Sequence, residues 1–219
     1  MKNILITLTT FTILTACIAT NNKIEPSVNA EAFPDFVFNA SDAQAAQPIK
    51  PHQFTTTQKK ELTFTKCKDT LSFNVDKISE YEYFRFKLLL LSCNAIEKIS
   101  KATASNVSFY PKQLSNSFYS ELPAIALPAL SEADKKNKQN KTINSYLNKP
   151  EFTNENGAIK ITTSEDEFYI TLLARGDFNK DGIEDLLIKT EWYAKNSNGK
   201  HAELFILKKL DAKQAITVN

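Results

Sequence analysis

Oxygen-bearing side chains are concentrated in one short stretch, Arg175–Ile188, which reads RGDFNKDGIEDLLI. Counted from the first aspartate, the residues at positions 1, 3, 5 and 9 are Asp177, Asn179, Asp181 and Asp185. Side chains at alternate positions turn inward when a loop wraps around a hard cation, and calcium prefers such oxygen ligands. Gly182 at position 6 permits the sharp turn, and the backbone carbonyl of Ile183 at position 7 supplies a further oxygen. The pattern predicts a structural calcium site in this loop.

Two other interpretations use the same residues. A metal-free polar turn between two strands also favours Asp, Asn and Gly. The tripeptide Arg175-Gly176-Asp177 matches an integrin ligand, but an Asp177 that points into the loop is not available to a receptor. An EF-hand fits poorly, because position 12 is Ile188 and not the bidentate glutamate that such a loop requires.

The stretch DFNKDGIEDLLI resembles the DxNxDGxxDLxx motif of FG-GAP and VCBS repeats, in which a calcium loop joins two strands of a hairpin. The resemblance implies that the ion is held by Asp177, Asn179, Asp181, the carbonyl of Ile183, and Asp185. Such repeats usually occur in series and build propeller blades of about 40 residues. This chain has one copy, so we expect a single hairpin of this type and not a propeller.

The amino-terminal residues have the pattern of a bacterial lipoprotein signal. A short basic start precedes the apolar run at residues 4–16, which is shorter than the ~20 residues of a spanning helix. The run ends in Leu14-Thr15-Ala16-Cys17, which resembles the lipobox. The resemblance implies a signal peptide at residues 1–16, lipid on Cys17, and outer-membrane sorting because Ile18 is not aspartate. An ordinary signal peptide with an incidental Cys17 is the alternative.

The two other cysteines, Cys67 and Cys93, are expected to form a disulfide in the oxidising compartment that a signal peptide implies. A thiol nucleophile or a metal site is the competing interpretation. Neither cysteine lies in a CxxC motif, and both histidines are distant in sequence. The bond would contribute on the order of 3 kcal/mol to stability.

The charge of the chain is nearly balanced, with 27 Lys and Arg against 25 Asp and Glu. A nucleic-acid-binding domain needs a basic excess on one face, so we do not expect a nucleic-acid partner. The expected partners are the membrane, through the lipid, and an envelope protein or glycan.

The chain divides into three parts by composition. After the signal peptide, residues 17–52 are rich in Asn, Ala, Pro and Ser and predict a flexible tether, apart from the Phe33, Phe36, Val37 and Phe38 cluster, which we expect to dock on the domain. Residues 53–219 predict a single domain, in which 61–65 and 70–75 are expected strands.

A helix is expected from about Ser79, because apolar residues then recur at steps of three and four. Ser79 and Glu82 have the spacing of a capping box at its start. From residue 158 to 210 four alternating or apolar runs predict an antiparallel meander, at 158–163, 167–175, 184–193 and 202–210. On the second run Phe168, Ile170, Leu172 and Ala174 are expected on one face. The fold class is therefore α+β, with the helix packed on the meander and the calcium-loop hairpin within it.

The function that best agrees with these features is a non-enzymatic outer-membrane lipoprotein with a role in envelope interaction or assembly. Short proteobacterial lipoproteins that end in a GDFDGDGxEDLL-like hairpin resemble this chain. An envelope hydrolase is the alternative, on the acidic residues Glu165, Asp166, Glu167 and Glu191 with His201, although no GxSxG or HExxH motif occurs. A binding or inhibitor module is a third, if Trp192, Tyr193 and Phe205 form an exposed aromatic patch and not the core of the sheet.

Overall fold

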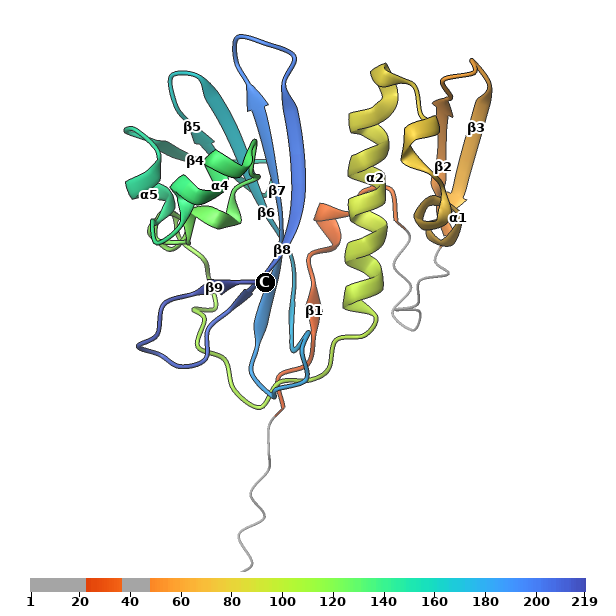
Figure 1. Ribbon diagram of the computed structural model, residues 1–219. Coiled ribbons are helices and arrows are strands. Elements are labelled where there is room, and N and C mark those ends of the chain that lie inside the picture. Colours follow the sequence, from red (N-terminus) through yellow and green to blue (C-terminus); the bar gives the residue numbers. More distant parts are fainter. Residues whose placement is uncertain (1–22, 37–47) are drawn as a thin grey trace, which may run out of the picture.

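The computed structural model describes residues 23–36 and 48–219. Its main feature is an antiparallel sheet that carries helices on both faces (Figure 1). The order along the sheet is β4-β5-β6-β7-β8-β9, and β1 pairs with Ala174 and Arg175 of β6, on the edge that β5 occupies at residues 167–170. A second, two-stranded sheet is formed by β2 and β3. The α+β fold class with an antiparallel sheet is confirmed.

The four predicted strands of the meander are present as β5 to β8. The strands of the main sheet are β1 (Ser27–Val28), β4 (Glu151–Glu155), β5 (Ala158–Thr162), β6 (Asp166–Gly176), β7 (Asp185–Ala194), β8 (Lys200–Lys208) and β9 (Thr217–Val218). The short strands β1, β4 and β9 were not predicted. β4 and β5 are joined by Asn156-Gly157, both with positive φ (52° and 78°), which suits a tight two-residue hairpin turn.

A β-bulge in β6 changes which side chains share a face. The register of β6 against β7 shifts between Leu172 and Ala174, so that Leu173 is the extra residue. Phe168 and Ile170 belong to one core, whereas Leu173 and Ala174 both belong to the other. The expectation that Ala174 shares a face with Phe168 is therefore wrong, because a bulge shifts the alternation by one residue.

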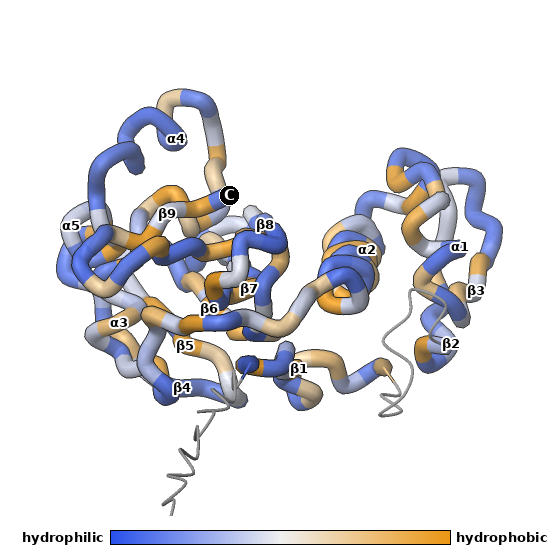
Figure 2. Tube along the Cα trace, turned by 90° about the horizontal axis from the view of Figure 1, so that it is seen from below, coloured by the Kyte–Doolittle hydropathy of each residue, from blue (hydrophilic) through white to orange (hydrophobic). Residues whose placement is uncertain are grey.

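Two hydrophobic cores lie on opposite faces of the sheet. Helix α2 (Glu80–Ile99) lies between one face and the β2–β3 hairpin, as Figures 1 and 2 show. Its buried residues are Phe86, Leu89, Cys93, Ala95, Ile96 and Ile99. The other face is covered by short helices: α3 (Asn116–Ser120), η3 (Ala124–Ala126), α4 (Glu132–Lys138) and α5 (Ile143–Tyr146). Pro111, Pro123 and Pro128 fall between these elements, which limits their length.

The start of α2 differs from the expected capping box. Ser79 is the N-cap residue, but its side chain makes no capping hydrogen bond. Glu82 instead accepts from Arg85, and the Arg85 guanidinium also donates to the carbonyl of Gln53 on β2. The same guanidinium lies 4.0 Å from the ring centre of Phe54. The carboxylate that a local cap would have used is thus bound by Arg85 of the same helix, which also contacts the β2–β3 hairpin.

The described parts of the expected tether, residues 23–36 and 48–52, belong to the folded domain. β1 pairs with β6, and Asn29 donates from its backbone and side chain to the carbonyls of Leu173 and Leu172 at 2.9 Å each. Phe33 and Phe36 are buried, as expected for docking, and Val37 and Phe38 lie outside the described residues. β2 (Pro48–Thr55) then pairs with β3 (Glu61–Lys66). Burial of the Phe33 and Phe36 rings and the hydrogen bonds of this segment to β6 together oppose the entropy lost on docking.

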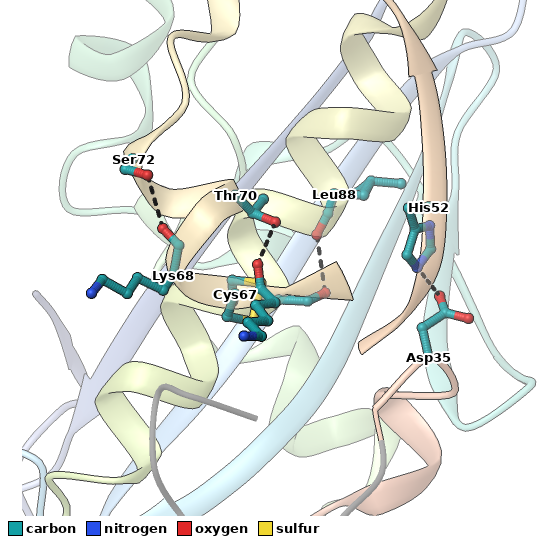
Figure 3. The surroundings of a disulfide bond; sticks show 10 residues. Asp35, His52, Cys67, Lys68, Thr70, Ser72 and Leu88 are labelled. Carbon is teal, nitrogen blue, oxygen red and sulfur yellow. Dashed lines mark hydrogen bonds and ion pairs between the residues drawn. A yellow bond between two sulfur atoms is a disulfide. The ribbon is translucent and has the colours of Figure 1, made fainter. Parts of the chain in front are cut away.

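Residues 70–75, expected as a strand, contain two helical turns. α1 (Cys67–Ser72) is followed by η2 (Val75–Lys77), because the apolar residues Leu71, Phe73 and Val75 pack on α2 and β3 and do not extend a sheet. Figure 3 shows the surroundings of α1, including the pair between His52 Nε2 and Asp35 Oδ2, which are 3.5 Å apart.

The predicted disulfide is confirmed. Cys67 at the first residue of α1 is bonded to Cys93 on α2 (Figure 3). Both cysteines are fully buried in the core between α2 and the β2–β3 hairpin. The bond therefore links the outer β2–β3 layer to the helix that lies against the main sheet.

Candidate metal centre

The candidate loop connects β6 to β7, and the carboxylate of Asp177 organises it. Asp177 Oδ1 accepts hydrogen bonds from the backbone N–H groups of Asn179, Lys180 and Asp181 at 3.3, 2.6 and 3.2 Å. Asp177 Oδ2 accepts from the N–H of Gly182 at 2.8 Å and from Thr103 Oγ1 at 3.3 Å. Only 2% of Asp177 is exposed, so this charge is stabilised by a ring of amide dipoles.

Asn179 and Asp181 form the exposed tip of the loop. The Asn179 amide donates to Asp181 Oδ2 at 2.7 Å, and Asp181 Oδ1 accepts from the N–H of Ile183 at 2.8 Å. Lys180 and Gly182 adopt positive φ angles of 67° and 83°. The positive φ of Gly182 favours glycine at this turn, and a Cβ there would also force the Asn106 side-chain amide, 2.7 Å away, to shift.

Asp185 is the first residue of β7, and only 1% of it is exposed. Its Oδ2 accepts from the N–H of Phe178 at 3.2 Å. The pKa of this carboxyl is raised to about 6, chiefly by burial; the charges of Asp181 and Asp177 add to this effect, and the Phe178 N–H and Lys208 oppose it. Ionisation of Asp185 therefore costs more free energy in the folded loop than in water, and an added positive charge would offset that cost.

The segment between α2 and α3 holds the loop in place. Thr103 and Asp177 exchange backbone hydrogen bonds at 2.9 and 3.0 Å. The Asn106 N–H donates to the Gly182 carbonyl at 2.7 Å, and the Glu184 N–H donates to the Val107 carbonyl at 2.9 Å. The end of the hairpin is thus built from two distant parts of the chain, which the sequence motif did not reveal.

A buried ion pair lies behind the loop and was also missed. Arg175 donates to Glu184 Oε2 from Nη2 at 2.9 Å and from Nε at 3.2 Å, and Ser108 Oγ donates to the same oxygen at 2.5 Å. Arg175 also donates to the carbonyls of Pro111 and Lys112. The only sequence feature that could have indicated this ion pair is the opposite charge of Arg175 and Glu184 at the two ends of the predicted hairpin loop. Because Arg175 is engaged and Asp177 is buried, the Arg-Gly-Asp tripeptide is not presented to a receptor.

The residues fit calcium by donor type, although they do not form a ready-made cage. In residues 23–36 and 48–219 no three His, Cys, Asp or Glu side chains are grouped as a metal site. The loop nevertheless gathers the oxygen donors of Asp177, Asn179, Asp181 and Asp185. Asp177 and Asp185 are fixed and buried, whereas Asn179 and Asp181 are exposed and can turn toward an ion. Within the described chain no Lys, Arg or His forms an ion pair with the three aspartates.

The acidic residues considered for hydrolysis do not gather in one site. Asp166 accepts from the Trp192 indole N–H at 2.8 Å, and His201 Nε2 lies 3.0 Å from Glu203 Oε1. Glu167 and Glu191 line one cavity, but each is ion-paired, with Lys160 at 3.0 Å and with Lys189 at 2.8 Å. Both carboxylates are therefore already engaged with a lysine.

The aromatic residues considered for a binding patch are divided between the two faces of the sheet. Trp192 and Phe205 pack against the core beneath the short helices. Tyr193 lies on the other face, where it lines the cavity with Glu167 and Glu191. The expectation of a core role thus holds for Trp192 and Phe205 and not for Tyr193.

Cys17, the expected lipidation site, lies outside the described residues. In the part of the chain that is described, no helix has the length and apolar character needed to cross a membrane. Comparisons with protein-family models, with curated proteins and with solved structures find no match to this chain.

Proposed function

We propose that this protein is a non-enzymatic, lipid-anchored outer-membrane protein whose β6–β7 loop binds calcium as a structural ion. The proposed role is envelope interaction or assembly. The lipid attachment rests on the sequence Leu14–Cys17. The observation that carries the calcium proposal is the burial of two carboxylates, Asp177 and Asp185, in one loop without an ion-pair partner among the described residues.

Calcium would supply the missing positive charge. Its oxygen ligands would come from Asp177, Asn179, Asp181 and Asp185, with the carbonyl of Ile183. Sites of comparable extracellular modules bind calcium at roughly 10⁻⁴ to 10⁻³ M. The hairpin end is already held by the Thr103–Val107 segment, so we expect the ion to stabilise the loop and not to be required for folding.

The variant Asp185→Asn separates the cost of the buried charge from the gain of calcium. In chelator the folded pKa of about 6 exceeds the ordinary unfolded value of about 3.9. The folded state then binds more protons, so the free energy of unfolding falls as pH rises from about 4 to about 6, by at most about 3 kcal/mol. The asparagine side chain of the variant cannot ionise, so this dependence disappears and the variant should be more stable than wild type at pH 7.5 in chelator.

Calcium should reduce that difference. At about ten times Kd the wild type gains about 1.4 kcal/mol, whereas Asp185→Asn gains little because it has lost a charged ligand. Thermal melts and calorimetric titration measure both effects. Asp211→Asn is the matched control, because Asp211 also accepts backbone N–H groups in a turn, at 2.7 and 2.9 Å, outside the loop. Identical wild-type melts in chelator and in about 10 mM calcium would reduce the loop to a polar turn.

The lipid attachment is tested by metabolic labelling with palmitate in a bacterial host. We expect label on the wild-type chain and recovery in the outer-membrane fraction. Cys17→Ser should abolish both, because the lipid is expected on that thiol. The double variant Cys67→Ser/Cys93→Ser is the control and should keep the label. Label that persists in Cys17→Ser would contradict the assignment.

A further inference from the structure

An open groove lies on the main sheet at the opposite end of the β6–β7 hairpin from the loop. Its volume is about 370 Å³, and its lining includes Glu155 and Asn156 from the β4–β5 turn, Glu167 and Tyr169 from β6, and Glu191 and Tyr193 from β7. It lies beside the first turns of α2, because the Phe84 ring contacts the Tyr193 ring with centroids 5.6 Å apart. No property proposed so far accounts for these side chains.

The floor of the groove is an alternating array of tyrosine and glutamate. Glu167 is paired with Tyr193 across the strands, and Tyr169 is paired with Glu191. Directly opposed residues of an antiparallel pair project from the same face, so the four side chains form a two-by-two square. The two tyrosine rings meet edge to face, with centroids 5.7 Å apart, and Phe84 extends this aromatic line toward α2.

Each glutamate is held by one lysine and one tyrosine. Glu167 is bound by Lys160 Nζ at 3.0 Å and accepts from Tyr169 Oη at 3.3 Å. Glu191 is bound by Lys189 Nζ at 2.8 Å and accepts from Tyr193 Oη at 2.5 Å. Burial raises the pKa of Tyr193, and the Glu191 hydrogen bond raises it further, so its hydroxyl remains a donor. The same Lys–Glu–Tyr unit therefore occurs twice, and its glutamate and tyrosine line the groove.

The charges of this array nearly cancel, because three glutamates against two lysines leave one net negative charge. Lys160 is also 3.5 Å from Glu155, so the three glutamates of the groove are set against two lysines at close range. A strongly cationic or anionic ligand would have to break these pairs or approach a like charge. A neutral ligand meets neither penalty, and it finds both acceptors, on the carboxylates, and donors, on the ammonium groups.

We propose that this groove binds a neutral oligosaccharide. Sugar rings present hydroxyl groups that both donate and accept, which matches the paired Glu and Lys. They also present faces of C–H groups, which pack on aromatic rings such as Tyr169, Tyr193 and Phe84. The line of rings from β6 to α2 is longer than one side chain, which favours an oligomer of several sugar units over a monosaccharide.

The test is titration of the ¹⁵N-labelled protein, followed by amide chemical shifts, with chitotetraose, cellotetraose and maltotetraose as neutral probes. Pentalysine and a heparin tetrasaccharide are the charged probes. We expect saturable shifts from at least one neutral probe at about millimolar concentration, confined to residues 155–171 and 189–194. The titrations are run in chelator, so that failure of the calcium proposal does not affect the result.

Variants locate the binding. Tyr169→Ala removes one ring and Glu191→Gln removes one charged acceptor, and each should weaken binding about tenfold. Tyr169→Phe retains the ring and should bind more tightly than Tyr169→Ala, which also guards against loss of fold as the cause. Tyr83→Ala is the matched control, since Tyr83 is a 44% exposed tyrosine of α2 that does not line the groove; its binding should equal wild type.

Two results would overturn the proposal. One is the absence of shifts in the groove with all three neutral probes up to about 20 mM, a concentration that detects even weak binding. The other is binding of pentalysine or the heparin fragment at these residues when the neutral probes do not bind, which would assign the groove to a charged peptide or an anionic polymer.

Discussion

We expect Arg175→Met to lower the free energy of unfolding by about 3–5 kcal/mol. The substitution leaves Glu184, whose side chain is only 5% exposed, without its guanidinium partner. It also removes the donors that bind the carbonyls of Pro111 and Lys112. An ionised carboxylate that is buried without a partner is among the most costly defects a fold can contain. Urea denaturation at pH 7.5 measures the change.

The double variant Arg175→Met/Glu184→Met distinguishes an orphaned charge from lost packing. It should recover a large part of the loss, because a buried ion pair replaced on both sides by apolar groups is often tolerated. Lys101→Met is the surface control. Lys101 pairs with Glu97 at 2.6 Å, but its side chain is 69% exposed, so we expect a change below about 0.5 kcal/mol. A loss below about 1 kcal/mol in Arg175→Met would show that the pair does not hold the hairpin end.

Removal of the Cys67–Cys93 disulfide should have an effect of similar size. The bond spans a sequence separation of 26 residues, and the chain-entropy estimate for a loop of this length is about 3–4 kcal/mol. The unfolded chain gains that freedom when the bond is absent. Cys67→Ala/Cys93→Ala should therefore unfold at a lower urea concentration than the oxidised wild type.

A reducing agent provides the internal control for this experiment. It should shift the wild type toward the double variant and leave the double variant unchanged, because no other cysteine pair is present in residues 23–36 and 48–219. The aromatic cluster of Phe54, Phe64, Phe73 and Phe86, with ring centroids 5.2–5.9 Å apart, still joins the β2–β3 layer to α2. Equal stability of the oxidised wild type and the double variant would mean that the aromatic cluster is sufficient, without the disulfide, to hold the β2–β3 hairpin on α2.

Features with a regular pattern could be predicted from the sequence. The strands β5 to β8 are alternating or continuous apolar runs of five or more residues, and their order follows from short connections. The disulfide followed from the cysteine count and the expected compartment. In these cases local pattern and tertiary packing favour the same result.

Features that depend on distant contacts could not be predicted. The bulge at Leu173 has no marker in its own sequence, and Asn29, which is distant in sequence, binds the carbonyls of Leu172 and Leu173 there. Residues 70–75 alternate like a strand but have no partner strand to join. Leu71 and Phe73 instead pack on the core beside α2.

The candidate site shows the same division. The motif located the loop and the order of its oxygen donors, because those depend on spacing alone. It did not reveal that the loop amides bind the Asp177 carboxylate, nor that residues 103–112 clamp the loop from outside. The groove lined by Glu167, Tyr169, Glu191 and Tyr193 could not be predicted either. Residues that alternate with core positions of a strand usually face solvent without a function.

The docking of residues 23–36 has a consequence for how the domain would lie at a membrane if the proposed lipid attachment holds. Ile24 exchanges backbone hydrogen bonds with Ser105, within the segment that clamps the Asp177–Asp185 loop. If Cys17 carries the lipid, the chain from Cys17 to Lys23 spans at most about 21 Å. That length keeps the loop end close to the bilayer surface, while the opposite end of β6 and β7, with its groove, points outward. The domain would then stay close to the membrane surface, because the segment between it and the lipid is short.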